Sequence, residues 1–285
     1  MTLHRRPQPA GPYPYPSHRA GAGAGTGTPA HASTGTGTGT PLLVIAHGSR
    51  DPRHAETVRA LTGRVAAARP GLRVETAFLD FCAPSVPQAV RHLAADGVEQ
   101  AVALPLLLTR AFHAKSDIPA VLRESTAGWP SLRLRTADVL GPSRLLTAAL
   151  ERRLYDAGLR PGDRSSTGVV LASAGSSDPE ANAVIAAIAR EWRRTGWCAV
   201  RPAFASASLP RTEDAVRDLR AQGVRRVAVA PYVIAPGFLP DRIAQGARAA
   251  GADVLADVLG PAPELAELLL RRYDEALTPV RSSAA

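Results

Sequence analysis

The sequence predicts an α/β protein built from two similar halves, each a four-stranded parallel sheet with helices on both faces. Two observations support this fold class. Short apolar runs alternate with longer amphipathic stretches from Pro41 onward, and the whole pattern occurs twice. The alternation favours parallel sheets, because parallel neighbours need long crossover connections that place helices on the sheet faces.

In the first half, four apolar runs predict strands over residues 42–46, 74–79, 101–108 and 132–136. The amphipathic stretches between and after them predict helices over residues 52–69, 85–95, 118–125 and 143–157. Asp51-Pro52 is typical of a helix N-cap followed by proline at the first helical position, which is a structural signal. We therefore expect an α/β domain over residues 41–157.

The second half follows a polar linker, residues 158–167, and repeats the same order. Its strands are expected at 169–172, 199–203, 226–230 and 253–256, within a domain over residues 168–278. The letters recur as well: GSRDP at 48–52 is echoed by GSSDP at 175–179, and ADVLGP at 137–142 is repeated at 256–261. These matches indicate an internal duplication.

Residues 1–40 are rich in Pro, Gly, Ala, Thr and Ser, and such a segment buries too little apolar surface to offset its chain entropy. We expect a disordered tail. Its scattered arginines could contact nucleic acid, but we expect no nucleic-acid partner. The tail has no hydrophobic core of a signal peptide, and no apolar run reaches membrane-spanning length, so neither export nor membrane insertion is predicted.

The charge balance favours anionic small ligands. Lys and Arg total 34 against 25 acidic residues, and nearly all the positive charge is arginine, which pairs bidentately with carboxylates and phosphates. Cys82 and Cys198 are the only cysteines and form no ligand-spaced pair. A reducing, cytoplasmic location is the simplest interpretation.

Three polar residues follow consecutive strands of the first half. His47 follows the first strand, Asp80 the second, and His113 the third. Ligands of open parallel sheets bind beyond the carboxyl ends of the strands, so these side chains are expected to converge. Each one alone has a plainer explanation, as a hydrogen-bonded loop histidine or a turn carboxylate. His54 and His92 lie on predicted helices and are expected to be solvated.

The duplicated half acts as an internal control for this cluster. In the second half, the positions equivalent to the two histidines and the aspartate carry other residues. The glycines, the prolines and the Asp-Pro that starts the helix are kept. The pairs are His47 with Ala174, Asp80 with Ser206, and His113 with a position at or beside Leu239. Histidines that the fold itself required should recur in both halves. Their restriction to the first half therefore favours chemistry there.

Two histidines and a carboxylate are suited to an open metal site rather than a closed structural one. Imidazole binds first-row divalent ions, and the same groups accept protons, which insertion of a metal into a tetrapyrrole releases. The Gly48-Ser49 turn before a helix presents backbone N–H groups that could hold a carboxylate or phosphate.

Three segments in this order resemble the CbiX-like sirohydrochlorin chelatases, a branch of the class II tetrapyrrole chelatases. They are LLVIAHGSRDP at 42–52, AFLDFCAPSVPQAV at 77–90 and PLLLTRAFHAKSDIP at 105–119. The resemblance spans nearly everything after residue 40, including the duplication found in the long members. It implies two flavodoxin-like domains facing each other across a cleft. We expect a monomer, because the fused halves already supply both walls.

The resemblance also implies an activity and its residues. Cobalt, iron or nickel would be inserted into sirohydrochlorin without nucleotide hydrolysis, in cobalamin or sirohaem biosynthesis. His47 and His113 would bind the metal and take part in proton removal. Asp80 stands where the family has a glutamate, one methylene longer. Ser49, Arg50, Arg110 and Lys115 would face the carboxylates of the macrocycle.

Two other functions remain open at this point. A non-catalytic carrier of metal or tetrapyrrole would use the same histidines. A nucleotide-binding α/β enzyme would use the Gly48-Ser49 turn, but the chain lacks GxxxxGK[ST] and a GxGxxG after a strand.

Overall fold

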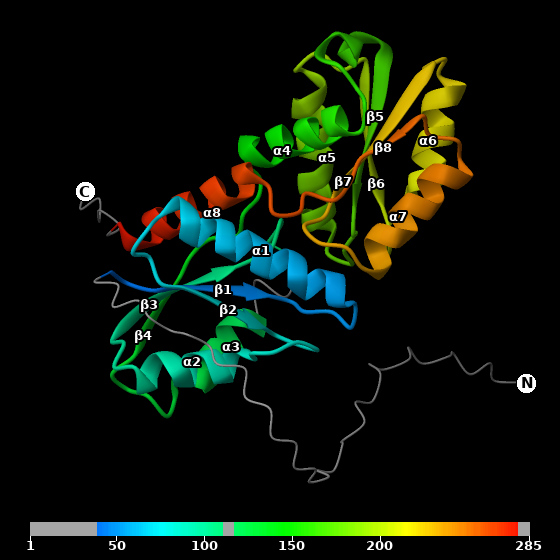
Figure 1. Ribbon diagram of the computed structural model, residues 1–285. Coiled ribbons are helices and arrows are strands. Elements are labelled where there is room, and N and C mark those ends of the chain that lie inside the picture. Colours follow the sequence, from blue (N-terminus) through cyan, green and yellow to red (C-terminus); the bar gives the residue numbers. More distant parts are fainter. Residues whose placement is uncertain (1–38, 111–116, 279–285) are drawn as a thin grey trace, which may run out of the picture. The chain divides into compact units, whose positions relative to one another are not determined.

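The computed structural model describes residues 39–110 and 117–278, and its first half is a parallel sheet of strand order β2-β1-β3-β4 (Figure 1). The strands are β1 (Leu42–Ala46), β2 (Val74–Phe78), β3 (Gln100–Pro105) and β4 (Arg133–Thr136). The helices are α1 (Pro52–Ala68), α2 (Val86–Ala95), α3 (Ile118–Thr126) and α4 (Arg144–Asp156).

The second half repeats this topology, with strand order β6-β5-β7-β8. Its strands are β5 (Thr167–Ser173), β6 (Ala199–Phe204), β7 (Arg226–Tyr232) and β8 (Val254–Leu255). Its helices are α5 (Pro179–Arg193), α6 (Thr212–Ala221), α7 (Phe238–Ala249) and α8 (Pro263–Leu277), and a 3-10 helix, η2 (Pro161–Ser166), precedes β5. The predicted fold class, two parallel sheets with flanking helices, is confirmed.

The central strands β1, β3, β5 and β7 are buried on both faces, and their alternate side chains enter different cores. In β1, Leu43 and Ile45 pack with α2 and α3, whereas Leu42 and Val44 face the opposite core. This period of two follows from the pleat, which sends successive side chains to opposite faces. Continuous apolar runs are therefore the signature of these central parallel strands.

The last helix of each half packs on the other half. Helix α4 lies against β7, and α8 lies against α1, β3 and β4. One of the apolar cores accordingly runs through both halves and includes Leu146 of α4 and Leu268 of α8. Arg152 of α4 and Glu264 of α8 join the two helices, with Nε to Oε1 at 3.0 Å. The domain boundaries at residues 157 and 168 stay a prediction.

Several strand boundaries differ from the expected ones, among them those of β3 and β5. Strand β3 ends at Pro105 rather than at residue 108; the Leu106 N–H still donates to the Ile45 carbonyl, but the Leu107 N–H turns back to the Pro105 carbonyl. Strand β5 begins at Thr167, inside the expected linker. The early end of β3 leaves residues 106–109 as a loop beyond the sheet.

Among the described residues, no helix combines the length and apolar composition that a membrane crossing requires.

Candidate active site

A cavity of about 710 Å³ lies beyond the carboxyl ends of the central strands of both sheets. Its first wall consists of the loops after β1 and β3 and the first turns of α1. Its second wall consists of the loops after β5 and β7 and the first turns of α5 and α7. Parallel sheets place ligand sites at these strand ends, so the cavity is the candidate site on topology alone.

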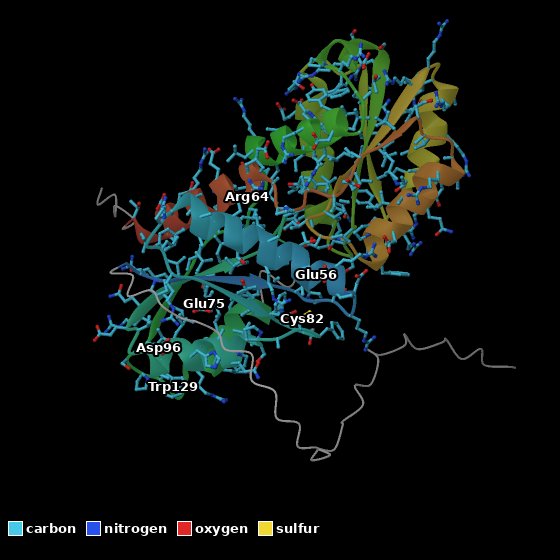
Figure 2. The ribbon with its side chains drawn as sticks, viewed as in Figure 1. Glu56, Arg64, Glu75, Cys82, Asp96 and Trp129 are labelled. Atoms are coloured by element: carbon cyan, nitrogen blue, oxygen red, sulfur yellow. The ribbon has the colours of Figure 1, made fainter. Side chains whose placement is uncertain are left out.

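The loop after β1 is held against the loop after β2. The Asp80 N–H donates to the His47 carbonyl at 2.9 Å, and Gly48 has a φ of 95°. A Cβ on Gly48 would lie 1.8 Å from the Asp80 carbonyl oxygen, so this position admits only glycine. Cys82, labelled in Figure 2, adds a second link, because its thiol donates to the Ser49 carbonyl at 3.2 Å.

His47 lines the cavity from the end of β1, and its side chain is exposed there. The strand that carries it is fully buried, which places the imidazole at a rigid point of the first wall. The equivalent position of the second wall is Ala174, which also lines the cavity. The two walls therefore differ in polarity at matching positions.

His54 is the residue that sequence reasoning missed. The expectation that it is solvated was wrong, because its side chain is half-buried and lines the same cavity as His47. Burial, and secondarily the charge of His47, lower the pKa of His54. Its ring packs near Phe78, with centroids 6.4 Å apart. His92, by contrast, is exposed as expected.

Ser49 also lines the cavity, near the start of α1. Its hydroxyl accepts from the Asp51 N–H at 3.1 Å, and Asp51 in turn caps α1 by accepting from the Arg53 N–H, which confirms the predicted N-cap. The hydroxyl faces the other wall: it lies 3.8 Å from where a Cβ on Gly237 would stand.

An ion pair bridges the two walls beside the cavity. The guanidinium of Arg53 on α1 contacts Asp241 on α7, with Nη2 to Oδ2 at 2.9 Å. Both side chains are largely exposed, so the pair contributes little stability. The ion pair shows that the first turns of α1 and α7 lie close together.

Asp80 is joined to His47 through the backbone, but its exposed side chain is not among the groups lining the cavity. Arg50 and Arg110 also lie outside the lining. Arg50 stacks on Phe81, with its guanidinium carbon 4.7 Å from the ring centroid. Arg110 pairs with Asp138 at 2.5 Å. The roles of these three residues stay predictions.

His113 and Lys115 fall within residues 111–116, outside the described part of the chain. Leu239, the expected counterpart of His113, lines the cavity at the start of α7. Within residues 39–110 and 117–278, no group of three or more His, Cys, Asp or Glu side chains could hold a metal ion. The predicted second nitrogen ligand thus remains untested.

Much of the second wall is apolar, and one of its polar side chains, Asn182, is engaged in internal hydrogen bonds. Asn182 donates to the Ser176 carbonyl and to the Ser208 hydroxyl, both at 2.7 Å, and accepts from the Ser176 N–H. Residues 233–240 contribute mainly aliphatic surface. This apolar part of the wall suits an apolar ring face rather than a charged group.

Tyr232, at the end of β7, lines the cavity with a buried hydroxyl that has no hydrogen-bond partner among the described residues. Burial raises the pKa of Tyr232, so its phenol stays neutral at physiological pH. A neutral hydroxyl of this kind is available to donate or accept one hydrogen bond from a ligand.

Comparison with known proteins finds relatives that are similar to this chain over both of its halves. The sirohydrochlorin cobaltochelatase of Priestia megaterium is 28% identical over 246 residues, covering 83% of this chain and 79% of that protein. The sirohydrochlorin ferrochelatase of the same organism is 25% identical over 233 residues, covering 80% and 87%. The solved structure of SirB from Bacillus subtilis with Fe3+ superposes with a TM-score of 0.73 at 24% identity, covering 83% of this chain and 95% of that one.

The family model CbiX matches twice, over residues 41–157 and 168–276. The two matches coincide with the two copies of the duplication, and together they span most of the chain. The likeness to the SirB structure shows that the fold is shared as well. The chain belongs to the CbiX family.

Proposed function

We propose that this protein is a sirohydrochlorin chelatase, a lyase that inserts a divalent metal ion into the metal-free tetrapyrrole. The observation that carries the proposal is His47, an imidazole on a rigid strand end facing a cavity of about 710 Å³, where the duplicated half has Ala174. Two relatives that cover about four fifths of the chain carry this activity in their names, one with cobalt and one with iron.

The chemistry follows from what the reaction needs. A metal entering the macrocycle replaces two pyrrole N–H protons, so the site must present metal ligands and proton acceptors to one face of the ring. His47 supplies one imidazole, and His113, known here only from the motif, is proposed to supply the second. An open site with few protein ligands lets the ion leave for the stronger tetrapyrrole ligand.

Asp80 is proposed to assist from the neighbouring strand end. Its backbone N–H is bonded to the His47 carbonyl, so small loop movements would affect both residues together. Its carboxylate is one methylene shorter than glutamate, and its side chain does not line the cavity. We propose that it assists His47 and His113 in catalysis and influences metal choice.

The acidic periphery of the substrate is proposed to extend past the cavity toward arginine side chains. Ser49 lines the cavity itself, whereas Arg50 and Arg110 lie outside it, and Lys115 completes the proposed set. Guanidinium groups suit carboxylates because they bind both oxygens at once. The salt bridge between Arg110 and Asp138 would have to exchange for a substrate carboxylate.

The metal is cobalt or iron in this proposal, with nickel as a further candidate, and no nucleotide is required. The product would feed cobalamin or sirohaem synthesis. A monomer suffices, because both walls of the cavity belong to one chain. A reducing, cytoplasmic setting suits the two free cysteines.

An insertion assay tests the proposal. Purified protein is mixed with sirohydrochlorin and Co²⁺, Fe²⁺ or Ni²⁺ in turn, without nucleotide, and the loss of metal-free absorbance is followed. A chelatase gives many turnovers per protein molecule with at least one metal, above the uncatalysed rate. A carrier of metal or tetrapyrrole gives at most stoichiometric conversion, and that result would replace the enzyme with the carrier.

A further inference from the structure

His54 lies in the first turn of α1, on the side of the helix that faces the cavity. It lines the cavity together with His47 and is half-buried, whereas Glu56, two residues on and labelled in Figure 2, is exposed. Phe78 lies beside the His54 ring, at 6.4 Å between centroids and a 58° tilt. The imidazole thus packs beside an aromatic ring of β2.

The duplicated half shows that the fold does not need this imidazole. The position equivalent to His54 in α5 is Ala181, which also lines the cavity and is 4% exposed. The described residues that line the first wall include two histidines, His47 and His54, and both correspond to alanines in the second wall. A side chain that helix packing required would be expected in both copies.

The buried nitrogen of His54 determines which atom the ring offers to the cavity. Its Nδ1 is buried without a hydrogen-bond partner. A buried N–H without an acceptor costs more than a buried lone pair, so the proton of the neutral ring belongs on Nε2. The ring therefore presents an N–H donor to the cavity. Metal coordination through Nε2 would instead force an unpaired N–H onto Nδ1, against the usual pattern.

The cavity needs neutral donors if it is to hold an anion. None of the described residues that line it is Lys, Arg, Asp or Glu. A carboxylate entering this space can be stabilised only by hydroxyl, amide or imidazole N–H groups, because an unpaired buried charge is costly. The amide of Asn182 is already engaged with Ser176 and Ser208. On the first wall, His54 offers an imidazole N–H donor beside the hydroxyl groups of Ser49 and Thr109.

We propose that His54 is a substrate-binding residue that donates its Nε2–H to a peripheral carboxylate of the acidic tetrapyrrole and so orients the macrocycle over His47. This role rests on the proposed function, since it takes the substrate from it. His54 does not bind the metal ion.

The test measures binding of metal-free sirohydrochlorin, by absorbance or fluorescence titration, to the full-length protein. His54→Leu keeps a side chain of similar size but removes the donor, and is expected to weaken binding about tenfold to hundredfold, the range for a hydrogen bond to a charged group. His54→Gln keeps an N–H donor and is expected to stay within about threefold of wild type. His92→Leu, on an exposed helical site, is the matched control and is expected to bind as wild type.

Two further measurements separate this role from others. Co²⁺ binding to the protein without tetrapyrrole is expected to be unchanged in His54→Leu; a matching loss of Co²⁺ affinity would overturn the assignment in favour of a metal ligand. The melting temperature of His54→Leu is expected not to fall, because an unpaired buried nitrogen is removed.

Tetrapyrrole binding by His54→Leu equal to wild type would also overturn the assignment. Failure of the proposed function looks different: wild-type protein would then neither bind sirohydrochlorin nor metallate it, and all variants would be alike.

Discussion

The loops after β1 and β5 have the same backbone and different chemistry. Gly48 and Gly175 have φ angles of 95° and 84°, and a Cβ on either would collide with a carbonyl oxygen of the neighbouring loop, at 1.8 and 2.1 Å. The crosslink between loops is also repeated: the Asp80 N–H donates to His47 in one half, and the Ser206 N–H donates to Ala174 in the other, both at 2.9 Å.

The difference between the halves therefore separates what the fold requires from what function requires. Glycines and Asp-Pro caps recur because backbone geometry requires them. Three first-half side chains, His47, His54 and Asp80, do not recur, although their counterparts occupy the same places in the fold. Comparing equivalent positions of the two halves thus identifies candidate functional residues without any other sequence.

The largest expected effect comes from removing an imidazole of the first wall. His47→Ala is expected to lower the insertion rate by roughly 10²–10⁴-fold, the usual contribution of a positioned proton-transfer group. His113→Ala should act similarly. Ala174→Ser, at the matching place in the second wall, should leave the rate near wild type. Insertion assays of the three variants check this, and normal activity in His47→Ala would contradict the asymmetry of the walls.

The two glycines should behave alike in stability. Gly48→Ala and Gly175→Ala are each expected to cost roughly 3 kcal/mol of unfolding free energy, because a methyl group would overlap a backbone carbonyl at positive φ. Denaturant unfolding of both variants measures the cost. A loss at only one of the two positions would show that the loops are not equivalent in the way their backbones indicate.

A smaller effect is expected from lengthening the carboxylate. Asp80→Glu should change the ratio of cobalt to iron insertion by a factor of a few, since about 0.5–1 kcal/mol of differential metal binding is enough for this. Ser206→Ala, its counterpart in the copy, should leave the ratio unchanged. Competition assays with both metals measure it. A ratio that Asp80→Glu does not alter would exclude Asp80 from the metal's surroundings.

The smallest effect concerns pH. Burial, and then His47, lower the pKa of His54 in the folded protein, whereas Asp51 acts in the opposite direction. His54 therefore binds a proton more readily in the unfolded chain than in the folded protein. As the pH falls below about 6.5, the ordinary pKa of histidine, this difference lowers the free energy of unfolding. The melting temperature of His54→Leu minus that of wild type should therefore increase as the pH is lowered from 7.5 to 5.5. A constant difference would mean that His54 titrates normally.

Much of the fold could be predicted because its signals are local. Apolar runs gave the order of the strands, and Asp51-Pro52 marked the start of α1 within the first copy and, through its echo, the start of α5 in the second. Strand ends were less predictable. Leu106, Leu107 and Leu108 continue the apolar run after Pro105, but they line the cavity instead of extending β3.

His54 was missed because its surroundings are assembled from distant parts of the chain. A histidine on an amphipathic helix is solvated or buried depending on what covers that face, and here the loops after β5 and β7 complete the cavity. A signal was nevertheless present. The comparison of copies that singled out His47 against Ala174 also pairs His54 with Ala181.

The reciprocal placement of α4 and α8 has a consequence for how the molecule can be divided. Cutting the chain within η2 would leave each fragment with a sheet face that its own helices do not fully cover, since Leu146 and Leu268 belong to a core spanning both fragments. Such fragments should be poorly behaved alone and should recover native structure only on being mixed. The two copies of the duplication are therefore expected to depend on each other for a fully covered core.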